Sequence, residues 1–134
     1  MAKLFSDEWI NELKDAWNKT PEVKDKLAEI GFNAVITCGY KDKESPECVF
    51  IVENGEAVRA GLYGGEVPDW DMRADAKDWY KWVEKPLSMA SMGMAVATGK
   101  LKFKKGDYAS MIKNPSMAGP FIRSFALMNE IGAE

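Results

Sequence analysis

The chain has 134 residues and a mass of 15.0 kDa, the size of one domain that can bury a core without metal or disulfide staples. Its formal charge of -3 and isoelectric point of about 5.1 provide no overall positive field for nucleic acid or an anionic membrane. The chain has no histidine, which excludes histidine-based catalytic arrangements and histidine-ligated metals, and two cysteines are too few for a four-thiolate site. No metal, cofactor or nucleic acid partner is therefore expected.

Residues 1–31 are predicted to form two amphipathic helices. Ser6 is an N-cap candidate, and apolar residues then recur at helical spacing to about residue 19. Thr20 followed by Pro21 marks a second helix start, and Gly31 can end that helix in the left-handed conformation.

From Asn33 the apolar period changes from 3.6 to 2, which indicates strands. Strands are predicted over residues 34–40, 48–52, 57–63 and 70–74. Asn54-Gly55 predicts a type I′ hairpin turn, because that turn needs two residues that tolerate positive φ. Asp69 and Asp71 alternate with apolar residues on the last of these strands, so we expect both carboxylates to face water.

The second half of the chain is predicted to add a helix, a strand and a final helical segment. These are a helix from Asp75 to Pro86, a strand over residues 100–104, and a helical segment from Tyr108 that is interrupted near Pro115 and Pro120. The uncharged stretch between Pro86 and Gly99 receives no element. We therefore predict one α+β domain over residues 1–134: helices in 1–31, a sheet with an inserted helix in 33–107, and a helical segment in 108–132.

Cys38 and Cys48 are predicted on adjacent strands, where a disulfide is geometrically open. No apolar signal segment precedes them, which favours a reducing cytosol and buried free thiols. The longest uncharged stretch has 14 residues and is too short to span a bilayer. We expect a cytoplasmic protein without stable membrane insertion.

Apart from Met1, every methionine lies in the last 63 residues, interleaved with aromatic residues. Flexible, polarisable thioethers can line a surface that accepts variable apolar ligands. The same pattern is also compatible with an ordinary core, so the clustering leaves both interpretations open.

The motifs Asp69-Trp70-Asp71-Met72-Arg73-Ala74 and Gly99-Lys100-Leu101-Lys102-Phe103-Lys104-Lys105-Gly106-Asp107 flank a predicted helix that contains Asp78-Trp79. In this order they resemble the sterol carrier protein 2 family, most firmly from about Pro68 to Asp107. The resemblance implies a five-stranded, mostly antiparallel sheet with helices on one face, enclosing an apolar tunnel. It also implies a non-catalytic carrier of fatty acids, fatty acyl-CoA, sterols or phospholipids.

The resemblance further implies which residues contact the ligand. By the match of segments, the tunnel wall would comprise Trp79, Trp82, Met89, Met92, Met94, Leu101, Phe103, Met111, Phe121, Phe125 and Met128. A charged ligand head would meet the basic edge formed by Lys100, Lys102, Lys104 and Lys105, although edge-strand protection and solubility are the alternative role of these lysines. The chain lacks the peroxisomal Ser-Lys-Leu ending of many eukaryotic members, which favours a bacterial or archaeal cytosolic form.

Three functions therefore follow as hypotheses. The first is binding and transfer of an apolar ligand. The second is an accessory module that presents hydrophobic substrates to a partner enzyme. The third is an acyl-CoA thioester hydrolase or isomerase that uses carboxylates such as Asp71 or Asp75, for which the usual catalytic motifs are missing.

Overall fold

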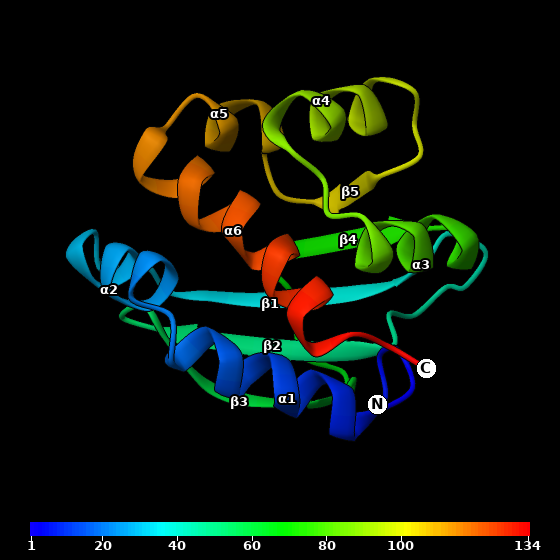
Figure 1. Ribbon diagram of the computed structural model, residues 1–134, viewed down its shortest axis with the longest axis horizontal. Helices are drawn as coiled ribbons and strands as arrows, with labels where there is room; N and C mark the ends of the chain where they lie inside the picture. The colour runs from blue at the N-terminus through cyan, green and yellow to red at the C-terminus, as the bar shows by residue number, and fades with distance from the viewer.

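The computed structural model describes residues 1–134 as one five-stranded sheet with six helices (Figure 1). The helices are α1 (Asp7–Asn18), α2 (Pro21–Glu29), α3 (Ala76–Glu84), α4 (Met89–Ala97), α5 (Tyr108–Ile112) and α6 (Pro115–Ile131). The strands are β1 (Ala34–Tyr40), β2 (Cys48–Glu53), β3 (Glu56–Leu62), β4 (Trp70–Ala74) and β5 (Lys102–Lys105). The predicted α+β class is confirmed.

The strand order is β3-β2-β1-β4-β5, and three of the four neighbouring pairs are antiparallel. The exception is the central pair of β1 and β4, which run parallel with Ile36 opposite Trp70. Residues 63–69 therefore cross past β2 and β1 to connect the edge strand β3 with β4. The sheet is mostly antiparallel, as predicted.

Helices α1, α3 and α6 lie on the same face of the sheet (Figure 1). Two tryptophans anchor this layer, and both are completely buried. The indole of Trp79 in α3 donates to the Gly39 carbonyl on β1 at 2.9 Å, and the indole of Trp9 in α1 donates to the Gly132 carbonyl at 2.7 Å. Because each indole nitrogen is satisfied, these large side chains can occupy the core without an unpaired polar group.

The turn predicted at Asn54-Gly55 is confirmed, because both residues have positive φ, 50° and 84°. Gly55 is also held from outside the hairpin, since the Trp17 indole donates to its carbonyl at 2.9 Å. A Cβ atom at this position would overlap the backbone of α2 at Lys24 and Ala28. The turn is therefore a packing point between the hairpin and the N-terminal helices.

The uncharged stretch between Pro86 and Gly99 contains a helix, α4, which the sequence analysis left unassigned. Ser88 caps it: its hydroxyl accepts from the Ser91 backbone N–H at 3.2 Å, while the Ser91 hydroxyl accepts from the Ser88 N–H at 2.8 Å. The helix has no charged residue, so no polar face alternates with an apolar one to reveal its period.

Two predicted boundaries after α4 are corrected by the structure. The strand β5 begins at Lys102 rather than Lys100, because the backbone N–H of Leu101 donates to the Ala95 carbonyl of α4 at 3.1 Å. The interruption near Pro115 is confirmed, and this proline starts α6 in its first turn. Pro120, however, lies inside α6 without ending it.

The prediction that Asp69 and Asp71 face water is wrong for Asp71, which is only 6% exposed. Asp71 pairs with Arg73, which is 1% exposed on the same strand. The guanidinium of Arg73 also donates to the backbone carbonyl of Lys43 at 2.7 Å. The loop over residues 41–47 is thus held against the Arg73 side chain, where it covers the ion pair and keeps water from it. Asp69 is exposed, as predicted, and its carboxylate accepts from the Val35 N–H at 2.7 Å.

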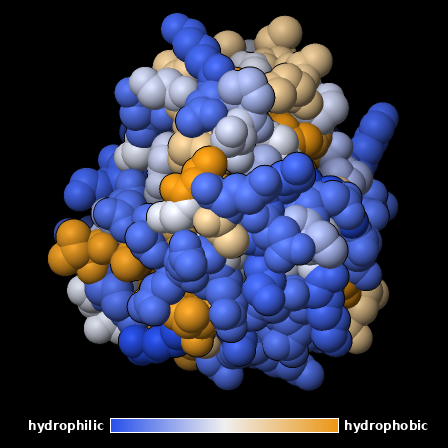
Figure 2. All heavy atoms as spheres, turned by 90° about the vertical axis from the view of Figure 1, so that its left-hand side faces the viewer, coloured by the Kyte–Doolittle hydropathy of each residue, from blue (hydrophilic) through white to orange (hydrophobic).

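None of the helices has both the length and the apolar character that crossing a bilayer requires. Figure 2 shows one side of the molecule, which is mostly hydrophilic over its lower part. Toward the upper end, where Figure 1 places α4 and α5, the atoms are paler, while a few strongly hydrophobic patches lie at the middle and lower parts of this face. The surface is therefore not uniform in polarity.

Candidate ligand cavity

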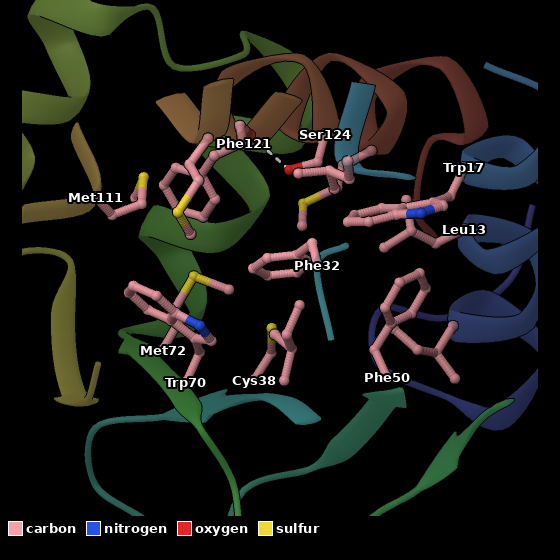
Figure 3. Close-up of a pocket in the computed structure, with 15 residues that line it drawn as sticks. Leu13, Trp17, Phe32, Cys38, Phe50, Trp70, Met72, Met111, Phe121 and Ser124 are labelled. Atoms are coloured by element: carbon pink, nitrogen blue, oxygen red, sulfur yellow. Dashed lines mark hydrogen bonds between the residues drawn. The ribbon is translucent and has the colours of Figure 1, made fainter. Parts of the chain in front are cut away.

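An apolar cavity lies between the helical layer and the sheet (Figure 3). Its wall comprises Ile10, Leu13, Trp17, Leu27, Phe32, Ile36, Cys38, Phe50, Trp70, Met72, Met111, Met117, Phe121, Ser124 and Met128. Ser124 is the only one of these residues that is not hydrophobic, and its hydroxyl donates to the Phe121 carbonyl at 2.6 Å within α6. The wall therefore presents hydrocarbon, aromatic rings and sulfur, with no charged side chain.

The floor of the cavity is formed by the sheet. Cys38 on β1, Phe50 on β2 and Met72 on β4 point from the strands toward the helices (Figure 3). Ile36 also lines the cavity and lies on the same face of β1 as Cys38, because side chains on one face of a strand recur at every second residue. The strand residues contribute a fixed surface, while the covering helices contribute most of the methionines.

Cys38 and Cys48 are cross-strand partners in the β1–β2 ladder. Both are buried free thiols, which confirms that prediction. The hydrogen bond to Cys38 and burial raise the pKa of the Cys48 thiol well above its usual range. Cys48 therefore stays neutral beside the cavity floor and adds no charge to it.

The open volume of the cavity is about 70 Å³, well below the roughly 300–1,000 Å³ of typical small-molecule pockets. Four methionines occupy the wall, namely Met72, Met111, Met117 and Met128. Methionine side chains are unbranched and have three rotatable bonds, so they can change shape at little cost. This part of the wall is therefore more adaptable in shape than a wall of branched side chains.

A half-buried aromatic cluster forms one rim of the cavity. Trp70 contacts Phe103 at a ring-centroid distance of 6.0 Å, and Phe103 contacts Tyr108 at 5.2 Å and Phe121 at 6.1 Å. Burial in this cluster raises the pKa of Tyr108. Phe121 also packs edge-on against Phe125 at 5.5 Å, which joins the rim to the core around Trp79.

The residues that the sequence placed on the tunnel wall divide into three groups. Those on the cavity are Met111, Phe121 and Met128. Those packed into the core away from it are Trp79, Trp82, Met92, Leu101 and Phe125. Phe103 is half-buried against Phe121, whereas Met89 and Met94 are exposed by 49% and 65%. Ligand contact by these residues remains a prediction.

The four head-group candidates Lys100, Lys102, Lys104 and Lys105 are all exposed, and none lines the cavity. Lys102 and Lys104 flank Phe103 on β5, so the aromatic rim separates them from the cavity. Their head-group role remains a prediction.

Much of the cavity wall comes from the N-terminal half of the chain, which the sequence analysis did not assign to the site. These residues are Ile10, Leu13, Trp17, Leu27, Phe32, Ile36, Cys38 and Phe50. The signal was present in the apolar stripes of the first two helices and in the alternation of the strands. The family resemblance instead implied wall residues only between Trp79 and Met128.

The carboxylates considered for catalysis lie away from this cavity. Asp71 is held by Arg73, with the guanidinium Nε at 2.7 Å from its Oδ1. Asp75 is exposed at the start of α3, on a separate polar hollow with Lys41, Lys77 and Lys100. No group of three or more cysteine, aspartate or glutamate side chains in the structure is placed to hold a metal ion.

No protein-family model matches the sequence, and no curated protein sequence matches it. Solved structures do match its fold. A crystal structure of sterol carrier protein 2 is 18% identical, with a TM-score of 0.75 over 96% of this chain and 98% of that one. A Thermus thermophilus protein described as a candidate sterol carrier protein is 20% identical, with a TM-score of 0.67 over 100% of this chain and 93% of that one.

A third structure, of the UbiJ-SCP2 ubiquinone synthesis protein, is 13% identical, with a TM-score of 0.56. The matched region covers 88% of this chain and 85% of that one. The resemblance noted in the motifs around β4 and β5 thus extends through most of the chain at the level of structure. The protein has the sterol carrier protein 2 fold.

Proposed function

We propose that this protein binds and carries lipids or other apolar molecules in the cavity between its sheet and its helices. The observation that carries the proposal is the wall itself, in which 14 of the 15 residues are hydrophobic. Apolar surface that is removed from water on ligand binding contributes about 25 cal/mol per Å². Ligand pockets are commonly lined in this way, and the fold shared with sterol carrier protein 2 supports the same interpretation.

The proposed role is that of a carrier rather than an enzyme. Cys38 is the only titratable side chain on the wall, and no carboxylate or amine lies there to move a proton. The thioester hydrolase hypothesis needs Asp71 or Asp75 at the substrate, but Asp71 is neutralised by Arg73 and Asp75 lies on another part of the surface. The buried free thiols also support a cytoplasmic location.

The cavity suggests which part of a ligand is buried. A wall without charge favours a hydrocarbon segment and leaves any charged head outside, because an unpaired charge is strongly disfavoured among apolar side chains. The small open volume favours a flexible chain that enters as the methionines rotate, rather than a rigid ring system. Fatty acids, fatty acyl-CoA and phospholipids fit this description better than sterols.

The deciding experiment is a titration of delipidated protein with a fluorescent fatty acid, followed by competition with fatty acyl-CoA, sterol and phospholipid. Saturable binding of one ligand per chain is expected, with sterol the weakest competitor. Met117→Trp should obstruct the half-buried end of the wall and weaken binding. Ile122→Trp is the matched control, because Ile122 is also half-buried in α6 but does not line this cavity.

Absence of saturable binding by folded protein, or equal losses in the two variants, would reject the cavity as the binding site. In the first case the partner-enzyme hypothesis becomes the better explanation of the fold.

We further propose that the lysines of β5 contact a charged ligand head at the aromatic rim. Replacing Lys102 and Lys104 with glutamine should weaken fatty acyl-CoA more than a fatty alcohol of the same chain length, since only the former carries phosphates. Equal losses for both ligands would leave edge-strand protection as the role of these lysines.

A further inference from the structure

The charges of this acidic protein are segregated along the chain. Residues 85–113 contain six lysines and a single acidic residue, Asp107, so this segment carries +5. Because the whole chain carries -3, the remaining residues carry -8. The overall charge therefore conceals a strongly basic segment.

The six lysines of this segment are Lys85, Lys100, Lys102, Lys104, Lys105 and Lys113. All six are exposed, and none takes part in the five ion pairs of the structure. None of their ammonium groups forms a direct ion pair, although Lys100 shares a polar hollow with Asp75 and Asp78, and Lys113 contributes to the lowered pKa of Asp107. The six lysines remain available to an anionic partner.

The same segment contains α4, a helix without any charged residue. Met92 and Ala95 pack into the core on its inner side, while Met89 and Met94 project from its outer side with 49% and 65% of their surface exposed. The outer side is thus also apolar, although no other part of the protein covers it. Exposed apolar groups on a helix of this kind are typical of interaction surfaces.

Helices α4 and α5 and strand β5 gather at one end of the molecule, the upper end in Figure 1. We call this end the α4–β5 pole and define it by α4, β5 and the six lysines named above. The strand β5 is an edge of the sheet, so its lysines are not covered by a further strand. Apolar side chains and unpaired positive charges therefore occur together at the α4–β5 pole.

We propose that the α4–β5 pole docks on the surface of an anionic lipid bilayer. Met89 and Met94 enter the boundary between head groups and acyl chains, and the surrounding lysines contact lipid phosphates. Helix α4 carries no charge of its own, so the lysines outside it supply the electrostatic attraction while its exposed methionines supply the apolar contact, the two contributions that add in binding at a membrane interface. Positive charges near an anionic leaflet each strengthen such binding, and the effect is screened by salt.

This docking does not require a ligand in the cavity, so it is tested separately from the proposed function. The probe is a phosphatidylcholine vesicle prepared with or without phosphatidylglycerol, and the readout is co-sedimentation of the full chain. Binding is expected only with phosphatidylglycerol, and it should weaken as salt is added. Failure of the folded protein to sediment with anionic vesicles overturns the proposal.

Charge variants identify the surface. Replacing Lys100, Lys102, Lys104 and Lys105 with glutamine should lower the vesicle partition coefficient by about tenfold or more, since each lysine near an anionic surface contributes substantially. The control replaces Lys3, Lys14, Lys19 and Lys24 with glutamine, all of which lie within residues 1–31. It loses four positive charges as well, so the two variants have the same net charge. An equal loss in both variants indicates general charge attraction and refutes docking by this pole.

A second pair of variants tests the apolar contact. Met89→Ser with Met94→Ser should weaken vesicle binding at high salt, where the electrostatic part is screened. Val58→Ser with Leu62→Ser is the control, because these β3 side chains are exposed by 43% and 61% at the opposite edge of the sheet. Unchanged binding by the methionine variant refutes insertion of α4. Thermal unfolding of each variant verifies that it is folded.

Discussion

Arg73 and Asp71, two residues apart on β4, form a buried bidentate ion pair. Arg73 Nε donates to Asp71 Oδ1 at 2.7 Å, and Nη2 donates to Oδ2 at 3.1 Å. The remaining guanidinium donors reach the backbone carbonyls of Tyr40, Lys43 and Glu44 at 2.7 to 3.2 Å. One side chain therefore neutralises a buried carboxylate and also fixes the loop that covers it.

Removing this arginine should be strongly destabilising. Arg73→Ala leaves Asp71 buried without a partner, and breaking a buried pair in this way costs about 3–5 kcal/mol. Arg59→Ala is the control, because Arg59 pairs with Glu66 at 3.3 Å while 66% of its own side chain is exposed, and exposed pairs contribute about 0–1 kcal/mol. Urea denaturation of both variants measures the difference, and similar losses would contradict the structural role of the buried pair.

The hairpin turn provides a second test. Gly55→Ala should destabilise the protein, because φ is positive and the added Cβ would overlap the backbone of Lys24 and Ala28. Gly65→Ala is the control: Gly65 also has a positive φ, 102°, but an added Cβ atom would have no other atom within 4 Å. We expect about 1 kcal/mol of loss from backbone strain at Gly65 and a clearly larger loss at Gly55. Equal decreases in the unfolding temperature of the two variants would show that α2 moves away from the added methyl group without loss of stability.

Tyr40 should make the fold sensitive to high pH. Burial, followed by the neighbouring Tyr80, raises the pKa of Tyr40 from 10.0 to about 12. The folded state thus holds this proton more tightly than the unfolded state, so the stabilising contribution is complete below pH 10 and is lost as the pH rises to about 12. Tyr40→Phe should flatten the fall in stability over this range. An unchanged pH profile would mean that other groups cause the fall.

The two thiols should be inert in the native protein. Both cysteines are buried, and the pKa of Cys48 is raised, so little thiolate is presented to a reagent in water. We expect negligible reaction with a thiol-specific aromatic disulfide reagent until the protein is unfolded in guanidinium, when both thiols react. Rapid labelling of native protein would contradict the packing of β1 against β2 and the helical layer.

The strands and their turns are the part of the fold that could be read from local sequence. The span of β1, predicted and observed at residues 34–40, and the Asn54-Gly55 turn depend on neighbouring residues only, so periodicity and turn chemistry sufficed to predict them. The burial of Asp71 depends on a loop some thirty positions earlier in the chain, which no local pattern reports. Helix α4 lacked the polar face by which an amphipathic helix is recognised.

The candidate site was predicted only in part, because some of its residues carry a signal in the sequence and others do not. Met111, Phe121 and Met128 could be found because the family resemblance extends to their segments and because methionines and aromatic residues cluster in the last 63 residues. Phe32 and Phe50 carry no such signal, since each is an ordinary apolar residue until the chain is folded. A cavity depends on which apolar faces leave space between them, and that information lies in three-dimensional packing rather than in the order of residues.

The indole of Trp9 donates to the carbonyl of Gly132, and the backbone N–H of Glu134 donates to the carbonyl of Ala2. These bonds join the first residues of the chain to Gly132 and Glu134, so they cannot form on a ribosome until those two residues have left the exit tunnel. Until then the first helix, however early it docks on β3, has an indole nitrogen without its native partner. Docking of the first helix can therefore be complete only after the segment around Gly132 has been synthesised and has folded against Trp9.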